Sequence, residues 1–203
     1  MEICRGKTVF AGAPSADFSK RAAQNGTRVF DYATEALLTD NAYLTAEGAV
    51  GIAVSDMPVA VRGADILVIG CGRIGRALSV LLKSMGAKVS VTALREESRV
   101  WAEECGFGFI RTDSMRDAAT KSLNAVFNTV PRPVFGTEEI KMTGPDCILV
   151  ELASRPGGID GTAAGALGRH YINAAGLPGK TAPMSASEII YREIKRILET
   201  EEI

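Results

Sequence analysis

The sequence predicts an α/β protein with a doubly wound parallel sheet, preceded by a partial βαβ unit. Two observations predict this fold class. From residue 66 onward, apolar segments of strand length alternate with helical patterns, which is typical of a parallel sheet with helices on both faces. Directly after the first of these strands, Gly70, Gly72 and Gly75 stand in G-x-G-x-x-G spacing and open a helix. Together these features indicate a Rossmann-like sheet.

The N-terminal part is expected to form one small βαβ unit. Its predicted elements are a strand at Lys7–Ala11, a helix at Asp17–Asn25 and a strand at Thr27–Tyr32. Such a unit is too small to bury both of its own faces, so it needs cover from the rest of the chain or from a second copy. We expect Asn41–Leu44 to be a connection, and Thr45 to cap a helix that ends near residue 55.

The main sheet is predicted from the alternation that follows. In order, the expected elements are strand Ile66–Ile69, helix Arg73–Met85, strand Lys88–Ala93, helix Glu97–Cys105, strand Phe107–Ile110, helix Met115–Lys121, strand Ala125–Asn128, helix Thr137–Met142, strand Ile148–Glu151 and strand His170–Ala174. A last helix is expected at Ala186–Glu199, because large aliphatic residues recur there at helical spacing.

Composition excludes several classes of protein. The 203 residues include 46% hydrophobic and 23% charged side chains, with a formal net charge of −1. Since there is no basic block either, a nucleic-acid partner is not expected. No apolar run reaches the length of a membrane span, so no membrane association is expected. The four cysteines show no paired spacing, which favours reduced thiols, no metal site and a cytoplasmic location.

The glycine loop predicts a nucleotide site. The first glycine permits the tight turn, the second lets a pyrophosphate approach the backbone, and the third lets the helix pack closely on the strand. The pyrophosphate is expected at the helix N-terminus, where free N–H groups and the helix dipole favour an anion. The alternative is an ordinary glycine-rich turn between a strand and a helix.

The end of the second strand favours NADP(H), with NAD(H) as the second choice. An NAD site usually carries an Asp or Glu there for the ribose 2′-hydroxyl, but this strand ends in VTALR (91–95). Thr92 and Arg95 offer a hydroxyl and a guanidinium instead, and a guanidinium suits a 2′-phosphate because it binds bidentately. Arg73 and Arg99 add positive charge. In the alternative interpretation, Arg95 and Arg99 are solvated residues at the start of a helix.

The loops after the later strands are expected to face the nicotinamide and the substrate, because ligands bind at the carboxyl ends of parallel strands. The polar residues of the loop 128–131 suit a ribose or a carboxamide. Arg155 and Lys180 are suited to hold a carboxylate, and Glu47 or Glu151 to move a proton. For each of these four residues, a structural role is the alternative.

Five segments resemble the A-subunit family of dipicolinate synthase. In chain order they are TAEGA (45–49), GCGRIGRAL (70–78), NTVPRPV (128–134), ELASRPGGID (151–160) and GLPGKTAP (176–183). Their order and spacing match as well, from about residue 7 to the C-terminal helix. The resemblance implies a nicotinamide-dependent oxidoreductase subunit. It would transfer a hydride to or from a dihydro- or tetrahydrodipicolinate-type substrate, in dipicolinate synthesis during sporulation.

The resemblance also implies partners and site residues. The expected partners are a small dicarboxylate substrate and a flavoprotein-like B subunit. Substrate contact and catalysis are expected at Glu47, Arg155 and Lys180, although the family more often has Lys in place of Arg155. The expected cofactor contacts are Gly70, Gly72, Arg73, Ile74, Gly75, Thr92, Ala93, Arg95, Asn128, Thr129, Val130, Pro131, Leu152, Ala153 and Ser154.

The resemblance implies a domain organisation similar to that of 2-hydroxyacid dehydrogenases. Residues 1–44 would be part of a substrate domain, 45–185 a cofactor domain with its entry helix, and 186–203 a helix that returns toward the N-terminal part. Family members carry a further N-terminal segment that completes the substrate domain. We therefore expect self-association as a homo-oligomer, or pairing with another chain. The alternative function is a non-catalytic NADP(H)-binding sensor or scaffold module.

Overall fold

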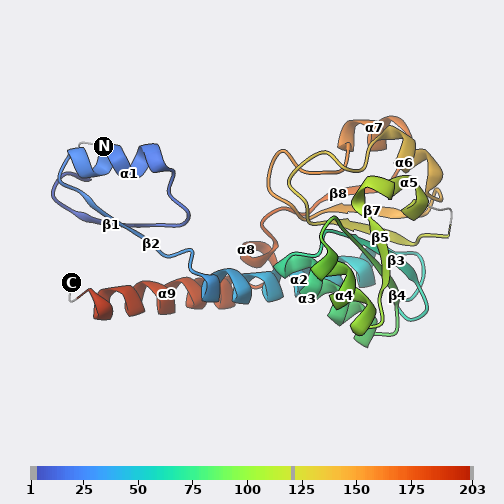
Figure 1. The fold of residues 1–203 in the computed structure, drawn as a ribbon, viewed down its shortest axis with the longest axis horizontal. Coiled ribbons are helices and arrows are strands. Elements are labelled where there is room, and N and C mark those ends of the chain that lie inside the picture. Colours follow the sequence, from blue (N-terminus) through green and yellow to red (C-terminus); the bar gives the residue numbers. More distant parts are fainter. Residues whose placement is uncertain (1–3, 120–121, 202–203) are drawn as a thin grey trace. The chain divides into compact units, whose positions relative to one another are not determined.

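The computed structural model describes residues 4–119 and 122–201, and Figure 1 shows its ribbon. The chain divides into two compact units. The first comprises Met1–Asn41 and Pro183–Ile203, and the second comprises Ala42–Ala182. All of the predicted site residues lie in the second unit.

The second unit contains a six-stranded parallel sheet (Figure 1). Its strands are β3 (Asp65–Ile69), β4 (Lys88–Ala93), β5 (Gly108–Arg111), β6 (Ala125–Asn128), β7 (Ile148–Glu151) and β8 (Tyr171–Asn173). They are ordered β5-β4-β3-β6-β7-β8, and each neighbouring pair is parallel. The order runs outward in both directions from β3 and β6, as in a doubly wound sheet. The predicted fold class is confirmed.

Two apolar clusters lie on opposite faces of this sheet. Side chains alternate between the faces of a strand, so Ile66 and Val68 belong to one cluster and Leu67 and Ile69 to the other. This double burial explains why β3 is a continuous apolar run. The flanking helices are α3 (Arg73–Ser84), α4 (Glu96–Glu104), α5 (Met115–Ala118), α6 (Thr137–Met142), α7 (Gly161–Ala166) and α8 (Leu177–Thr181), with a 3-10 turn at Thr112–Ser114.

Helix α2 (Glu35–Asp56) is one continuous helix of 22 residues. The predicted connection at Asn41–Leu44 is therefore wrong, and so is the predicted cap at Thr45, which is buried within the helix. Alanines recur every three or four residues along this helix, and such small side chains let it pack closely against its neighbours. The buried alanines are Ala42, Ala46, Ala49 and Ala53.

Two further helices occupy segments that we expected to be loops. Helix α7 is capped by the Asp160 carboxylate, which accepts a hydrogen bond of 2.9 Å from the N–H of Ala163. Helix α8 follows Gly176, which has a left-handed backbone conformation with φ of +74°. Helix α5 is shorter than predicted, and Lys121, its predicted end, lies outside the described residues.

The first unit contains the predicted βαβ segment. Strands β1 (Thr8–Ala11) and β2 (Arg28–Asp31) form a parallel pair connected by α1 (Ala16–Gln24). The rings of Phe10 and Phe30 stack with centroids 5.8 Å apart. Helix α9 (Pro183–Thr200) starts three residues earlier than predicted. Within residues 4–119 and 122–201, no helix combines the length and the apolar character needed to cross a membrane.

Candidate cofactor site

The turn between β3 and α3 is built around three glycines. Gly70 has φ of +101°, which side chains rarely adopt, and a Cβ there would lie 2.4 Å from Thr129 Oγ1. A Cβ on Gly75 would lie 2.0 Å from the carbonyl oxygen of Gly70. A Cβ on Gly72, in contrast, would meet nothing within 4 Å. Folding therefore requires the first and third glycines, whereas the second faces open space.

Gly72 is also the N-cap of the 12-residue helix α3. The N–H groups at the start of a helix lack intrahelical partners and carry a partial positive charge. The first turn of α3 contains no acidic residue to compete for them. This end of the helix fits a pyrophosphate, which needs both N–H donors and close approach to the backbone. Arg73 and Ile74, the first residues of α3, flank this position.

A hollow of about 630 Å³ lies beside the glycine turn. Arg95, the N-cap of α4, contributes to this hollow, and Ala93 ends the preceding strand. The expected position of the adenosine is thus bordered by an arginine, without an acid at the strand end. The residues that line the hollow are Cys71, Arg76, Arg95, Glu96, Glu97 and Ser98.

Arg99 and Arg95 have different surroundings. Arg99 donates from Nε to Glu96 Oε1 at 2.8 Å and from Nη1 to Glu103 Oε1 at 2.7 Å. The guanidinium holds the pKa of the Glu96 carboxyl below its usual value. Arg99 is therefore a surface residue of α4, as in the alternative interpretation. In the described part of the chain, no side chain hydrogen-bonds or ion-pairs with that of Arg95.

Thr92 supports the turn through its backbone. Its carbonyl oxygen accepts a hydrogen bond of 3.0 Å from the N–H of Gly70. Its side chain is fully buried, and its hydroxyl accepts from Thr112 Oγ1 at 3.4 Å. Thr92 therefore supports the glycine turn through its backbone carbonyl, and its buried hydroxyl does not line the hollow.

Arg76 also lines the hollow, although it is not among the predicted cofactor contacts. Its Nε donates to the carbonyl oxygen of Cys71 at 3.1 Å. Its guanidinium lies 4.7 Å from the ring centroid of Trp101, in a cation–π contact that holds the side chain in place. Its position in the sequence could have indicated this role, because Arg76 directly follows Gly75, the third glycine of the motif.

Asn128 and Glu151 end neighbouring strands and are paired in the sheet register. Both side chains are buried, and Asn128 Nδ2 donates to Glu151 Oε1 at 2.7 Å. The carboxylate of Glu151 also accepts from the backbone N–H groups of Ala153, Gly158 and Ile159 at 2.9, 2.7 and 2.9 Å. Glu151 therefore organises the loops, and the alternative, structural role that we weighed for it is the one that these contacts support.

The remaining predicted contacts lie on the two loops that this pair holds. Thr129 donates from Oγ1 to the carbonyl oxygen of Ile69 at 2.9 Å, which ties its loop to β3. The Asn128 amide accepts from the N–H of Val130 at 3.1 Å and donates to its carbonyl oxygen at 2.9 Å. Leu152 and Ala153 are buried, whereas Pro131 and Ser154 are exposed at the carboxyl edge of the sheet.

The three residues expected to contact substrate lie on three different elements. Glu47 lies on α2 and lines a hollow of about 370 Å³ together with Thr181 and Ala182 at the end of α8. Lys180, on α8, donates from Nζ to the carbonyl oxygen of Ala175 at 2.8 Å. The structure thus brings Glu47 close to the helix that carries Lys180. Arg155 is exposed on the loop after β7 and lines neither that hollow nor the one beside the glycine turn.

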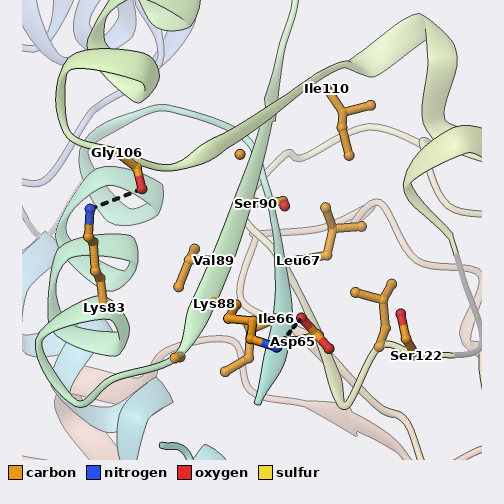
Figure 2. A pocket seen from close by; sticks show the side chains of 13 residues that line it. Asp65, Ile66, Leu67, Lys83, Lys88, Val89, Ser90, Gly106, Ile110 and Ser122 are labelled. Carbon is orange, nitrogen blue, oxygen red and sulfur yellow. Dashed lines mark hydrogen bonds and ion pairs between the residues drawn. The ribbon is translucent and has the colours of Figure 1, made fainter. Parts of the chain in front are cut away.

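Another hollow, of about 520 Å³, lies near the amino ends of β3 and β4, away from the carboxyl ends where the candidate site is (Figure 2). Asp65 and Lys88, the first residues of β3 and β4, lie at its lower end in this view. Lys83 points toward the carbonyl oxygen of Gly106 and donates to it at 2.9 Å. Since cofactors of doubly wound sheets bind at the carboxyl ends of the strands, this hollow is not part of the candidate site. Among the described residues, no group of three or more His, Cys, Asp or Glu side chains is placed to hold a metal ion.

Comparison with known proteins identifies the family. The profile of the D-isomer specific 2-hydroxyacid dehydrogenase NAD-binding domain matches residues 40–177. The chain belongs to this family. The match covers most of α2 and the six-stranded sheet, and with them every predicted site residue except Lys180.

Individual relatives agree with the predicted resemblance. The A-subunit of dipicolinate synthase from Bacillus subtilis (strain 168) is 27% identical over 191 residues, which cover 94% of this chain and 64% of the relative. The crystal structure of the same Bacillus subtilis protein has a TM-score of 0.88 at 26% identity, over 96% of this chain and 65% of that one. The resemblance to the A-subunit family of dipicolinate synthase is thus confirmed.

Two further structures share the fold. The A-subunit of dipicolinate synthase from Bacillus halodurans has a TM-score of 0.88 at 23% identity, covering 96% of this chain and 67% of that one. A transhydrogenase from Sinorhizobium meliloti has a TM-score of 0.79 at 22% identity, covering 97% and 69%. The chain spans just under two thirds of the length of the Bacillus subtilis relative. Family and geometry together establish a dehydrogenase-like chain with a site for a nicotinamide cofactor.

Proposed function

We propose that this chain is the NADP(H)-binding subunit of an oxidoreductase that acts on a dihydro- or tetrahydrodipicolinate-type substrate. One observation carries the proposal: the open space at Gly72 adjoins a hollow bordered by Arg95. A dinucleotide that places its pyrophosphate at Gly72 brings its adenosine ribose toward Arg95. The guanidinium then suits a 2′-phosphate in a way that a neutral residue does not.

The chain's own residues divide the work of holding the cofactor. Gly70, Gly72 and Gly75 shape the turn, and the N-terminus of α3 offers donors to the pyrophosphate. Arg95 and the positioned Arg76 bind the adenosine side. The residues for the nicotinamide side are Asn128, Thr129, Val130, Pro131, Leu152, Ala153 and Ser154. When bound, NADP(H) supplies the hydride transfer, and the protein supplies binding and orientation.

The substrate proposal rests on two cations and one carboxylate. Arg155 is exposed, and a guanidinium can hold a carboxylate bidentately. The ammonium of Lys180 has three donors, of which the bond to Ala175 uses one. Glu47 is exposed on α2 and is assigned the proton that accompanies hydride transfer. A dicarboxylate ring matches this set because each cation binds one carboxylate.

Assembly, pathway and location are also proposed by analogy. Both Bacillus relatives are the A-subunit of a dipicolinate synthase, so we propose that a flavoprotein-like B subunit is the partner and that the chain acts in sporulation. The two-stranded sheet of the first unit leaves its residues at most half-buried, which supports self-association. The four cysteines are free thiols, which supports a cytoplasmic location.

Calorimetric titration of the full chain with NADPH and then NADH tests the proposal. Tight binding of NADPH and weak binding of NADH is the expected result. Turnover is then measured from the absorbance of the reduced nicotinamide, with a dihydrodipicolinate-type substrate and with or without a B subunit. Binding without turnover under both conditions would favour the sensor or scaffold function. Binding of neither nucleotide would contradict the proposal altogether.

A further inference from the structure

The carboxylate of Glu151 is surrounded by hydrogen-bond donors. Oε1 accepts from Asn128 Nδ2 and from the N–H of Ala153, while Oε2 accepts from the N–H groups of Gly158 and Ile159. The distances lie between 2.7 and 2.9 Å, and the residue is 3% exposed. Asn128 is the last residue of β6, and the three backbone donors lie on the loop after β7.

The ionised form of Glu151 is the form that these donors require. A carboxylate only accepts hydrogen bonds, whereas an amide or a protonated acid presents a donor on one side. In Glu151→Gln, the amide NH₂ would face either Ala153 and Asn128 or Gly158 and Ile159, and would leave those buried N–H groups without an acceptor. A shorter Asp would keep the charge but would not reach both sets of donors. The cost of burying the charge is offset only when all four donors stay in place.

The two glycines of the following loop are explained by the same contact. Gly157 has φ of +82°, and a Cβ there would lie 3.0 Å from Glu151 Oε2. A Cβ on Gly158 would lie 2.5 Å from Asn128 Nδ2 and 2.8 Å from the carbonyl oxygen of Val130. The loop after β7 therefore folds back tightly over the Asn128–Glu151 pair, and it touches the loop after β6.

We propose that Glu151 is the positioning residue of the nicotinamide half of the site. It joins the loop 128–131 to the loop 152–159 and so fixes the backbone that faces the nicotinamide, while the adenosine half is formed separately by the glycine turn and α4. The inference rests on the proposed function, because it assumes that these loops meet a nicotinamide. It assigns no contact between Glu151 itself and the ligand, since the side chain is buried beneath both loops.

Two ligands separate this role from a general effect on folding. NADPH occupies both halves of the site, whereas 2′,5′-ADP has only the adenosine half. Loss of charge-assisted hydrogen bonds in Glu151→Gln is expected to weaken NADPH binding to the full chain about 10- to 100-fold. Binding of 2′,5′-ADP is expected to stay within about twofold, because its contacts lie on other loops.

Matched variants and a ligand-free measurement complete the test. Glu139→Gln is the control, since Glu139 also accepts a backbone hydrogen bond, from Gly136 N at 3.0 Å, but lies outside the pair. Amide hydrogen exchange of the unliganded chain is expected to accelerate at Ala153, Gly158 and Ile159 in Glu151→Gln and not in Glu139→Gln. If Glu151→Gln does not fold, Glu151→Asp replaces it. This variant is also expected to lose affinity for NADPH and not for 2′,5′-ADP, with a smaller loss than in Glu151→Gln.

Each outcome decides between the two proposals. Unchanged NADPH binding in Glu151→Gln, or equal losses for NADPH and 2′,5′-ADP, overturns the positioning role and leaves the cofactor site intact. If the wild-type chain binds NADPH no more tightly than 2′,5′-ADP, the nicotinamide half contributes no affinity, and the positioning role is overturned as well. Wild-type chain that binds neither ligand overturns the proposed function, and the positioning role falls with it.

Discussion

Gly72 and Gly75 belong to one motif, yet the structure predicts opposite consequences for the same substitution. In Gly75→Ala, the new Cβ would lie 2.0 Å from the carbonyl oxygen of Gly70, so the helix or the strand end must shift. In Gly72→Ala, the Cβ meets nothing within 4 Å, and the φ of −81° and ψ of −169° are ordinary for any residue. The first variant should therefore damage folding, and the second should damage binding.

The expected magnitudes follow from these contacts. Overpacking against immobile backbone costs about 3 kcal/mol, the upper part of the usual range, which lowers the Tm by roughly 6–12 °C in a domain of this size. Replacing an N-cap Gly with Ala costs at most about 1 kcal/mol, or roughly 2–4 °C. A methyl group between the backbone and the pyrophosphate should weaken NADPH binding at least about tenfold, or about 1.4 kcal/mol.

Thermal melting and calorimetric titration of both variants beside the wild type measure these effects. The result that refutes our account of the site is Gly72→Ala with wild-type affinity for NADPH, because the open space would then not be where the pyrophosphate lies. A Gly75→Ala melting temperature within about 2 °C of wild type would refute the packing argument. The pair is informative because each variant serves as the control for the other.

Three further predictions concern other residues. Arg95→Gln should weaken NADPH binding about 10- to 100-fold by calorimetry and leave NADH within about twofold, because only the 2′-phosphate contact is lost. Glu47→Gln should lower kcat about 10²- to 10⁴-fold without changing the Kd of NADPH, if this carboxylate moves the proton. Burial raises the pKa of the Cys147 thiol to about 12, so it should resist alkylation at about pH 8 in the folded chain, as read by mass spectrometry. The free energy of unfolding that the protonated Cys147 thiol contributes should be lost between about pH 9 and pH 12, because in this range the unfolded state releases a proton that the folded state keeps.

Each of these predictions has a control within the chain. Arg99→Gln should leave NADPH binding unchanged, because Arg99 is occupied by Glu96 and Glu103; a loss equal to that of Arg95→Gln would show a non-specific charge effect. Glu104→Gln, at the exposed end of α4, should keep full turnover. For Cys147, the alkaline loss of unfolding free energy should shrink in Cys147→Ala, and an identical profile would contradict the assigned cause.

Much of the second unit could be predicted from the sequence because its strands are buried on both faces. A strand such as β3 is apolar at nearly every position, and a glycine turn and a helix pattern follow directly. The start of helix α2 could not be predicted as well, because Asn41, Tyr43 and Thr45 have weaker local helix preferences than the alanines that follow them. The later alanines Ala46, Ala49 and Ala53 are buried in one apolar cluster with β3, and this tertiary packing stabilises the helix as a whole.

In the candidate site, roles set by neighbours in the sequence could be predicted, whereas roles set by contacts between distant segments could not. That Arg99 is a surface residue was readable from spacing alone, since Glu96 and Glu103 stand three and four residues away on one helix face. Glu151 gave no such signal: a carboxylate at a strand end is as well suited to proton transfer as to structure. What decides its role is the register that sets it beside Asn128, and a loop that returns seven and eight residues later with two N–H groups. The structural role of a buried acid is identified from the hydrogen-bond donors around it. For Glu151, two of these donors are on a loop that comes close only when the chain has folded, so the sequence alone does not show them.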